Sequence, residues 1–148
     1  MAFEKRDPME SLPHRDIALP FEEYEFDPAT GEVRVKMAFG NPYTQGHFPG
    51  KPLVPGHWSV ETMALAAGLG AADDIQASGK IPVLLGFNGA KFSQPIKPGE
   101  EVEVRGHLTR QSSRVIRGAG AISLANGEQA ASLDEFTVIL VDKDKVDN

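Results

Sequence analysis

Cysteine is absent from the sequence, so the chain can form neither a disulfide framework nor a thiolate metal site, and nothing argues for an oxidising compartment. Long apolar runs are also missing, because no stretch reaches the roughly 18 apolar residues of a membrane span. The first residues, MAFEKRDPMESLPHR, are charged and interrupted by proline where a signal peptide would need an apolar segment. These absences predict a cytoplasmic protein with no membrane partner.

Positive charge is in short supply. The chain has 15 Lys and Arg residues against 21 Asp and Glu residues, a formal net charge of -6 at pH 7, which works against broad binding to nucleic acid. With 148 residues, 41% of them hydrophobic, the chain is long enough to bury one ordinary core. We therefore expect a single domain over residues 1–148, with frayed ends at residues 1–9 and 142–148.

Strand patterns surround one helical segment. The segment EVEVRGHLTR alternates strictly, with Val102, Val104, Gly106 and Leu108 on one face, which is typical of a half-buried strand. The dipeptide Asn126-Gly127 is a strong hairpin signal, and DPATG holds turn residues between two further candidates. The predicted strands are residues 17–26, 31–39, 81–92, 101–110, 114–125 and 130–141.

The helical segment begins near Gly56 and runs to about Ala72. Apolar or small residues occupy every face of it, so we expect a buried helix, and the economical arrangement is an α+β fold in which a curved antiparallel sheet wraps around this helix. Glycine costs helix propensity, so Gly68 and Gly70 are expected to allow close packing against the sheet.

Glu61 is the only formal charge between His57 and Ala72. A carboxylate surrounded by protein has a raised pKa, because a low dielectric disfavours the anion, and it can then act as a general acid. The alternative is that Glu61 points from the helix edge into solvent or pairs with an Arg.

The segment before the helix, GHFPGKPLVPG, places Gly and Pro at short intervals, so His47 is expected on a stiff, tightly turned loop. The loop ends at a helix N-terminus, where the amides of Gly56 and His57 and the helix dipole can stabilise an oxyanion. A His, a Glu and an oxyanion site are the parts needed to remove a proton next to a carbonyl with loss of a neighbouring group.

The segment HFPGKPLVPGHWSVETMA resembles the H-F-P-G-x-P-x-x-P-G-x-x-x-x-E-x-M-A signature of the FabZ-type (3R)-hydroxyacyl-[acyl carrier protein] dehydratases, including the 14-residue spacing from His47 to Glu61. The segments SLPHR, TQGHFPG and AKFSQPIKPGEEV resemble further landmarks, so the likeness covers roughly residues 10–141. Glu61, where the decanoyl dehydratase/isomerase branch has Asp, favours the plain dehydratase.

This resemblance implies a hot-dog fold, with about five or six strands around one central buried helix. It implies that His47 takes the α-proton of a 3-hydroxyacyl thioester and that Glu61 protonates the departing 3-hydroxyl. The Gly56 amide, joined by that of His57, would hold the thioester oxygen. The other residues it places at the substrate are Phe48, Pro55 and Trp58.

The resemblance requires no metal and no cofactor. It implies an acyl carrier protein or CoA thioester as substrate, in fatty-acid or related lipid or polyketide biosynthesis, and a homodimer with shared active sites, which in this family also assembles into hexamers as trimers of dimers. Because carrier proteins are acidic, we expect a cationic cluster near the site. Its candidate members are Lys51, Lys91, Lys97, Arg110, Arg114 and Arg117.

Three positions depart from the family pattern. His57 and Trp58 replace two small or medium aliphatic residues, and Leu65 replaces a Gln. Trp58 either fills the core or narrows an acyl channel, so these departures bear on the substrate more than on the reaction. Two other functions stay open: hydrolysis of an acyl thioester, and acyl binding without catalysis.

Overall fold

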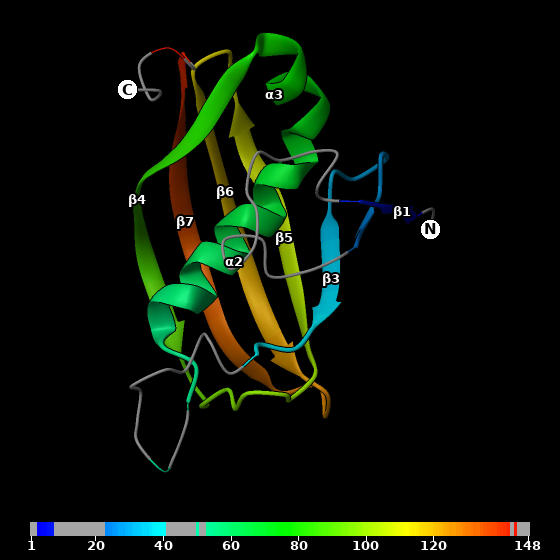
Figure 1. Cartoon of the computed structure of the whole chain (residues 1–148), viewed down its shortest axis with the longest axis vertical. Helices are drawn as coiled ribbons and strands as arrows, with labels where there is room; N and C mark the ends of the chain where they lie inside the picture. The colour runs from blue at the N-terminus through cyan, green and yellow to red at the C-terminus, as the bar shows by residue number, and fades with distance from the viewer. Residues whose placement is uncertain (1–2, 8–22, 41–49, 51–52, 143, 145–148) are drawn as a thin grey trace.

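The computed structural model describes residues 3–7, 23–40, 50, 53–142 and 144, and its largest feature is a curved seven-stranded antiparallel sheet (Figure 1). The strand order is β1-β2-β3-β5-β6-β7-β4, so β4, which follows the helices, forms one edge of the sheet. The strands are β1 Glu4–Arg6, β2 Tyr24–Phe26, β3 Val33–Met37, β4 Lys80–Phe92, β5 Val102–Gln111, β6 Val115–Leu124 and β7 Gln129–Asp142.

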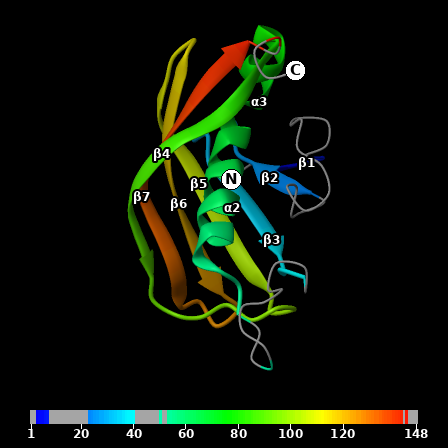
Figure 2. The ribbon, with the colours of Figure 1, turned by 60° about the vertical axis from the view of Figure 1, so that its left-hand side comes forward.

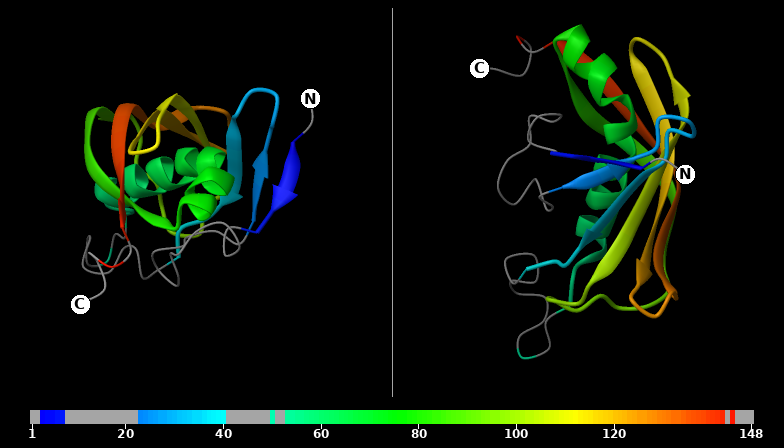
Figure 3. Two further views of the ribbon diagram at one scale, coloured as in Figure 1. Left: turned by 90° about the horizontal axis from the view of Figure 1, so that it is seen from above. Right: turned by 90° about the vertical axis from the view of Figure 1, so that its right-hand side faces the viewer.

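The helical segment lies inside the curve of the sheet (Figure 3). Helix α2 spans Gly56–Gly68, a 3-10 turn (η3) follows at Leu69–Ala71, and α3 spans Ala72–Ser78. The predicted start at Gly56 is confirmed, and the helical path continues beyond the predicted end at Ala72. It stops at Gly79, whose φ of 68° is a left-handed conformation that glycine adopts without strain.

The predicted strands correspond to β2 through β7, although residues 17–22 lie outside the described residues. The hairpin at Asn126-Gly127 is confirmed: Gly127 has a φ of 89°, and its amide donates to the Leu124 carbonyl at 2.9 Å. Strand β1, which pairs with β2, lies in a segment for which we expected no regular structure. It is the reason that the sheet has seven strands where the sequence predicted five or six.

Helix α2 lies close to the sheet because glycines on β5 and β6 have no side chains to hold it away. A Cβ built on Gly106 would lie 2.5 Å from the backbone nitrogen of Ala67, and one on Gly120 would lie 2.9 Å from the Cβ of Met63. The side chains of Val102 and Val104, on the same face of β5 as Gly106, are buried in the core. The strict alternation of this strand therefore predicted its inward face correctly.

The expectation for the helical glycines is half right. A Cβ on Gly70 would lie 3.2 Å from the Gly31 carbonyl oxygen, so Gly70 does permit a close approach. A Cβ on Gly68 would meet no atom of the described residues within 4 Å, so close packing among them does not explain Gly68. Its φ of -61° and ψ of -26° are ordinary helical values that any residue adopts.

We expect Gly106→Ala to lower the free energy of unfolding by about 1–3 kcal/mol, because the added methyl group would overlap the helix backbone at Ala67 and force the two layers apart. Urea unfolding would measure the change. Gly68→Ala is the matched control, and it should be neutral or stabilising by up to about 1 kcal/mol, because alanine is the better helix former. Equal effects of the two substitutions would contradict this account of the packing.

Candidate active site

Helix α2 leaves one stripe of its surface uncovered by the sheet. His57 and Glu61 are exposed, and Leu65 and Gly68 are half-buried. These positions are three or four residues apart and so share one helix face. The prediction that α2 is buried on every face is therefore wrong for this chain by itself, because the sheet curves around the opposite side of the helix (Figure 2).

Glu61 lies in this uncovered stripe, so the burial expected from the sequence is missing within the single chain. The alternative that its side chain points out from the helix is the one observed. Glu61 is also one of the residues that line an apolar cavity, which α2 forms with α3 and the sheet.

The cavity extends along α2 on the side of β4 and has a volume of about 70 Å³. The volume is several times the roughly 10–15 Å³ needed to admit one water-sized group. Among the described residues that line it, Glu61 is the only charged one. The others are apolar or lack a side chain: Ala64, Leu65 and Gly68 from α2, Ile75 from α3, Pro82 and Leu84 from β4, Ile116 from β6 and Val138 from β7.

The N-terminus of α2 lies one to two turns before Glu61. Pro55 precedes the helix with φ -60° and ψ 143°, and no side chain caps the first turn, which holds no acidic residue. The amide of Trp58 donates to the Pro55 carbonyl at 3.1 Å, whereas the amides of Gly56 and His57 are too early in the helix to have an acceptor within it. Among the described residues, therefore, no side chain occupies the positive end of the helix dipole, which can stabilise a negatively charged oxygen.

Gly56 is fixed at this place by an aromatic ring. A Cβ on Gly56 would lie 2.9 Å from Cζ of Phe92, at the end of β4, so the ring packs against the glycine backbone. A residue with a side chain at position 56 would displace Phe92 or the start of the helix. The family resemblance did not assign a role to Phe92, and its contact with Gly56 could not be foreseen from their separation in the chain.

Trp58 is half-buried and packs against the hydrophobic core, and its ring centroid lies 5.2 Å from that of His57. It does not belong to the cavity lining around Glu61. Of the two interpretations of Trp58, the structure therefore supports core packing over narrowing of this cavity. His47 and Phe48 lie outside the described residues. The other predicted site residues lie on α2 or directly before it: Pro55, Gly56, His57, Trp58 and Glu61.

Sequence reasoning did not identify the residues that enclose the cavity. Ile75 and Pro82 belong to separate elements, α3 and β4, that meet α2 only in the folded chain. Among the residues that the structure describes, no group of three or more carboxylate or imidazole side chains could hold a metal ion. No described helix is both long and apolar enough to cross a membrane.

The described candidates for the predicted cationic cluster do not all lie at one level of the sheet, and the cluster itself stays a prediction. Lys91 is in register with Ser132 of β7, while Arg117 is in register with Thr137 of β7 and with Arg110 of β5. Five residues of strand separate the two levels by about 16 Å. Lys91 therefore lies at a different level of the sheet from Arg110 and Arg117, so one local cluster does not contain all three. Lys51 lies outside the described residues.

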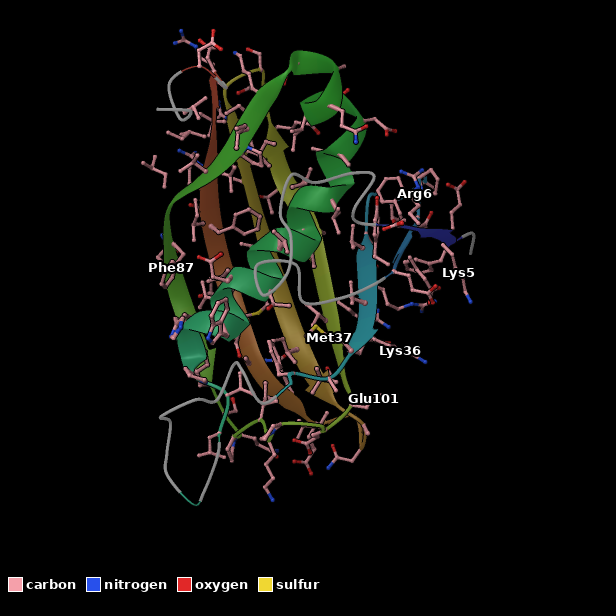
Figure 4. The ribbon with its side chains drawn as sticks, viewed as in Figure 1. Lys5, Arg6, Lys36, Met37, Phe87 and Glu101 are labelled. Carbon is pink, nitrogen blue, oxygen red and sulfur yellow. The ribbon has the colours of Figure 1, made fainter. Side chains whose placement is uncertain are left out.

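The edge strand β4 carries exposed apolar side chains next to the cavity. Leu85 is 64% exposed, Phe92 53% and Phe87 52%, and Figure 4 shows Phe87 on the side of the molecule where the sheet ends. Within the described part of the chain, no strand pairs with the outer side of β4. A long unpaired edge with apolar side chains is typical of a surface that another strand covers.

Known proteins resemble this chain in sequence and in fold. The model of the ApeI-like family, described as ApeI dehydratase, matches residues 23–127. A 3-hydroxyacyl-[acyl-carrier-protein] dehydratase FabZ of Anaeromyxobacter dehalogenans is 33% identical over 139 residues, covering 90% of this chain and 88% of the relative. The FabZ of Natranaerobius thermophilus is 31% identical, covering 90% of this chain and 94% of the relative.

Solved structures agree on the fold. The dehydratase heterocomplex ApeI:P of Xenorhabdus doucetiae superposes with a TM-score of 0.75 at 16% identity, covering 95% of both chains. A hypothetical thioesterase of Streptococcus pneumoniae with coenzyme A has a TM-score of 0.59 at 17% identity, covering 83% of this chain and 89% of that one. At such identities the likeness concerns the fold alone, and it confirms the hot-dog fold. With a family match over most of its length and FabZ relatives above 30% identity, the chain belongs to the ApeI-like dehydratase family.

Proposed function

We propose that the protein dehydrates a (3R)-hydroxyacyl thioester to the trans-2-enoyl thioester, in fatty-acid or related lipid biosynthesis. The observation that carries the proposal is the position of Glu61, the one charged group among the described residues that line an apolar cavity, one to two turns after a helix N-terminus that no described side chain caps. An acid between an apolar pocket and amide donors suits an acyl thioester, whose tail is apolar and whose carbonyl gains negative charge during the reaction. The FabZ relatives act on 3-hydroxyacyl groups held by acyl carrier protein, and we propose the same carrier here, with CoA as the alternative.

The proposed roles follow the chemistry of β-elimination. His47 removes a proton from C2, and the electron pair of that C–H bond forms the C2–C3 double bond. Glu61 gives its proton to the C3 hydroxyl, so the C–O bond breaks and water leaves. The proton that His47 gains balances the one that Glu61 gives, and exchange with solvent restores both groups.

The amides of Gly56 and His57 have the remaining role, which is to bind the thioester oxygen while C2 carries negative charge. Both amides are in the first turn, where an N–H group has no carbonyl partner within the helix. The first turn also holds no carboxylate that would compete for them. Phe92 supports this arrangement, because its ring packs against Gly56. Preorganised amides of this kind are usually among the largest contributions to stabilising a transition state.

We also propose that the protein is a homodimer in which β4 pairs with β4 of a second copy. The uncovered stripe of α2 meets β4 at the cavity, which Glu61 and Leu84 both line, so a partner along β4 would cover the exposed apolar side chains of that strand next to this stripe. Glu61 would then lose solvent exposure on assembly, and each site would be completed by the partner. The ApeI:P neighbour is a heterocomplex, so a different dehydratase chain is the alternative occupant of this edge.

The function is tested with 3-hydroxyacyl thioesters of graded length on acyl carrier protein and on CoA. We expect formation of the conjugated enoyl thioester, followed by its ultraviolet absorbance and by the loss of one water in the product mass. Release of free thiol without an enoyl product would favour hydrolysis. Retained acyl binding with neither product would indicate a binding protein, and both outcomes would overturn the proposed function.

A further inference from the structure

Gly68 is a glycine whose presence neither backbone conformation nor protein packing explains. Of the other glycines in this helical path, Gly56 lies against Phe92 and Gly70 against the Gly31 carbonyl. Gly106 and Gly120 lie against α2. Gly68 has helical dihedrals and open space where its side chain would be. That open space is the cavity at Glu61, because Gly68 is one of its lining residues.

Gly68 is the last residue of α2 along this cavity, at the end away from Glu61. Glu61, Leu65 and Gly68 follow one another along the uncovered stripe of α2, and seven residues of helix separate Glu61 from Gly68 by about 10 Å. Beyond Gly68 the cavity meets Ile75 of α3 and Pro82 at the start of β4. A group entering beside Glu61 would therefore pass Leu65 before it reaches the gap at Gly68.

We infer that Gly68 sets the length of the acyl chain that the site accepts, by keeping the end of the cavity away from Glu61 open for the last carbons of the chain. The inference rests on the proposed function, because it takes C3 of the substrate to lie at Glu61. An extended hydrocarbon chain advances about 1.25 Å per carbon, from a bond of about 1.5 Å and an angle near 111°. The 10 Å from Glu61 to Gly68 thus correspond to about eight carbons beyond C3.

The lining also defines the class of tail. Past Glu61 every lining side chain that the structure describes is apolar, and Leu65 occupies the position where the family pattern has Gln. A hydroxyl or charged group on the distal part of the chain would lose its water without gaining a hydrogen-bond partner from these side chains. The cavity therefore suits an unsubstituted hydrocarbon tail and should discriminate against one that carries a polar group.

The experiment compares the wild type with Gly68→Ala and Gly68→Val on the graded series of 3-hydroxyacyl thioesters. Substrates too short to reach Gly68 should keep their wild-type kcat/KM. The longest substrates that the wild type accepts should lose about 10-fold for each methylene that no longer fits, with the larger loss for Gly68→Val. Ile75→Val, which removes a methylene at the same end of the cavity, should move the preferred length upward.

The matched control is Ala77→Val, which adds similar bulk on the exposed surface of α3, outside the cavity. Its length profile should be that of the wild type. The melting temperature of Gly68→Ala should equal or exceed that of the wild type, because the new methyl group meets no atom within 4 Å in the part of the chain that the structure describes. A change in the profile therefore cannot come from a damaged fold.

An unchanged profile in both Gly68 variants, or an equal loss on all chain lengths, would overturn the inference. If the wild type dehydrates none of the thioesters, the proposed function has failed. The inference about Gly68 is then tested by the rise in melting temperature that each thioester causes on binding. If the longest acyl chain that stabilises the protein is shorter for Gly68→Ala than for the wild type, the inference is supported. A limit that the substitution leaves unmoved would overturn it.

Discussion

Replacement of Glu61 by Gln is expected to slow dehydration by at least about 100-fold, which is the usual contribution of a positioned proton-transfer group. The amide keeps the size of the side chain but has no acidic proton to give to the departing hydroxyl. Rate constants for wild type and variant on one 3-hydroxyacyl thioester would measure the loss. His47→Ala should lower the rate to a similar degree, because it removes the proposed base from C2.

Stability should hardly change in the Glu61 variant. The side chain is exposed within the chain, and surface substitutions of this kind usually change the free energy of unfolding by less than about 0.5 kcal/mol. Glu101→Gln is a matched control, since Glu101 is an exposed carboxylate just before β5, away from α2 (Figure 4). A folded Glu61→Gln protein with near wild-type turnover would remove Glu61 from the mechanism.

Local patterns were sufficient to predict most of the fold. Strict alternation in β5 identified its inward face, and Asn126-Gly127 located the β6–β7 turn, because both signals depend on residues adjacent in the chain. The start of α2 after Pro55 was also predictable, since proline and glycine limit the backbone there. The three-residue β1 carries too few residues for a periodic pattern, so its pairing with β2 could not be foreseen.

Features that depend on distant parts of the chain were predicted less well. The composition of α2 indicated burial on all sides, but the sheet covers one side of the helix and leaves Glu61 exposed. Which side the sheet covers depends on strands far away in the chain. Gly68 looked like the packing glycines around it, and only the folded arrangement shows that its open side is a cavity. Likewise, Lys91 and Arg117 are on strands that place them at different levels of the sheet.

The proposed general acid, Glu61, is exposed in the single chain. The exposed stripe of α2 and the apolar edge of β4 suggest how a second chain would shield it. If a second copy pairs along β4, the surface that surrounds Glu61 is completed by the partner, and burial of the apolar side chains Leu85, Phe87 and Phe92 would drive the association. His47 of one copy would then serve the Glu61 of the other. A light-scattering mass of twice the 16.0 kDa chain, or of six times that mass, is compatible with this pairing.

Co-refolding of equal amounts of His47→Ala and Glu61→Gln proteins is expected to restore about one quarter of wild-type activity. Two-fold symmetry gives a dimer two equivalent sites, and random pairing makes half of the dimers mixed. When each site takes His47 from one chain and Glu61 from the other, a mixed dimer has one site with both substitutions and one with neither. Half of the sites in half of the molecules are then intact.

Two controls make this result decisive. Each variant refolded alone should stay at its own low activity, and a size tag on one variant should show by native mass that mixed dimers have formed. If every site is instead built within one chain, each site in a mixed dimer keeps one defective residue, and no activity can return. A mixture with demonstrated subunit exchange that remains inactive would therefore rule out shared sites, whereas a purified chain that stays at 16.0 kDa would point to a different chain as the partner along β4.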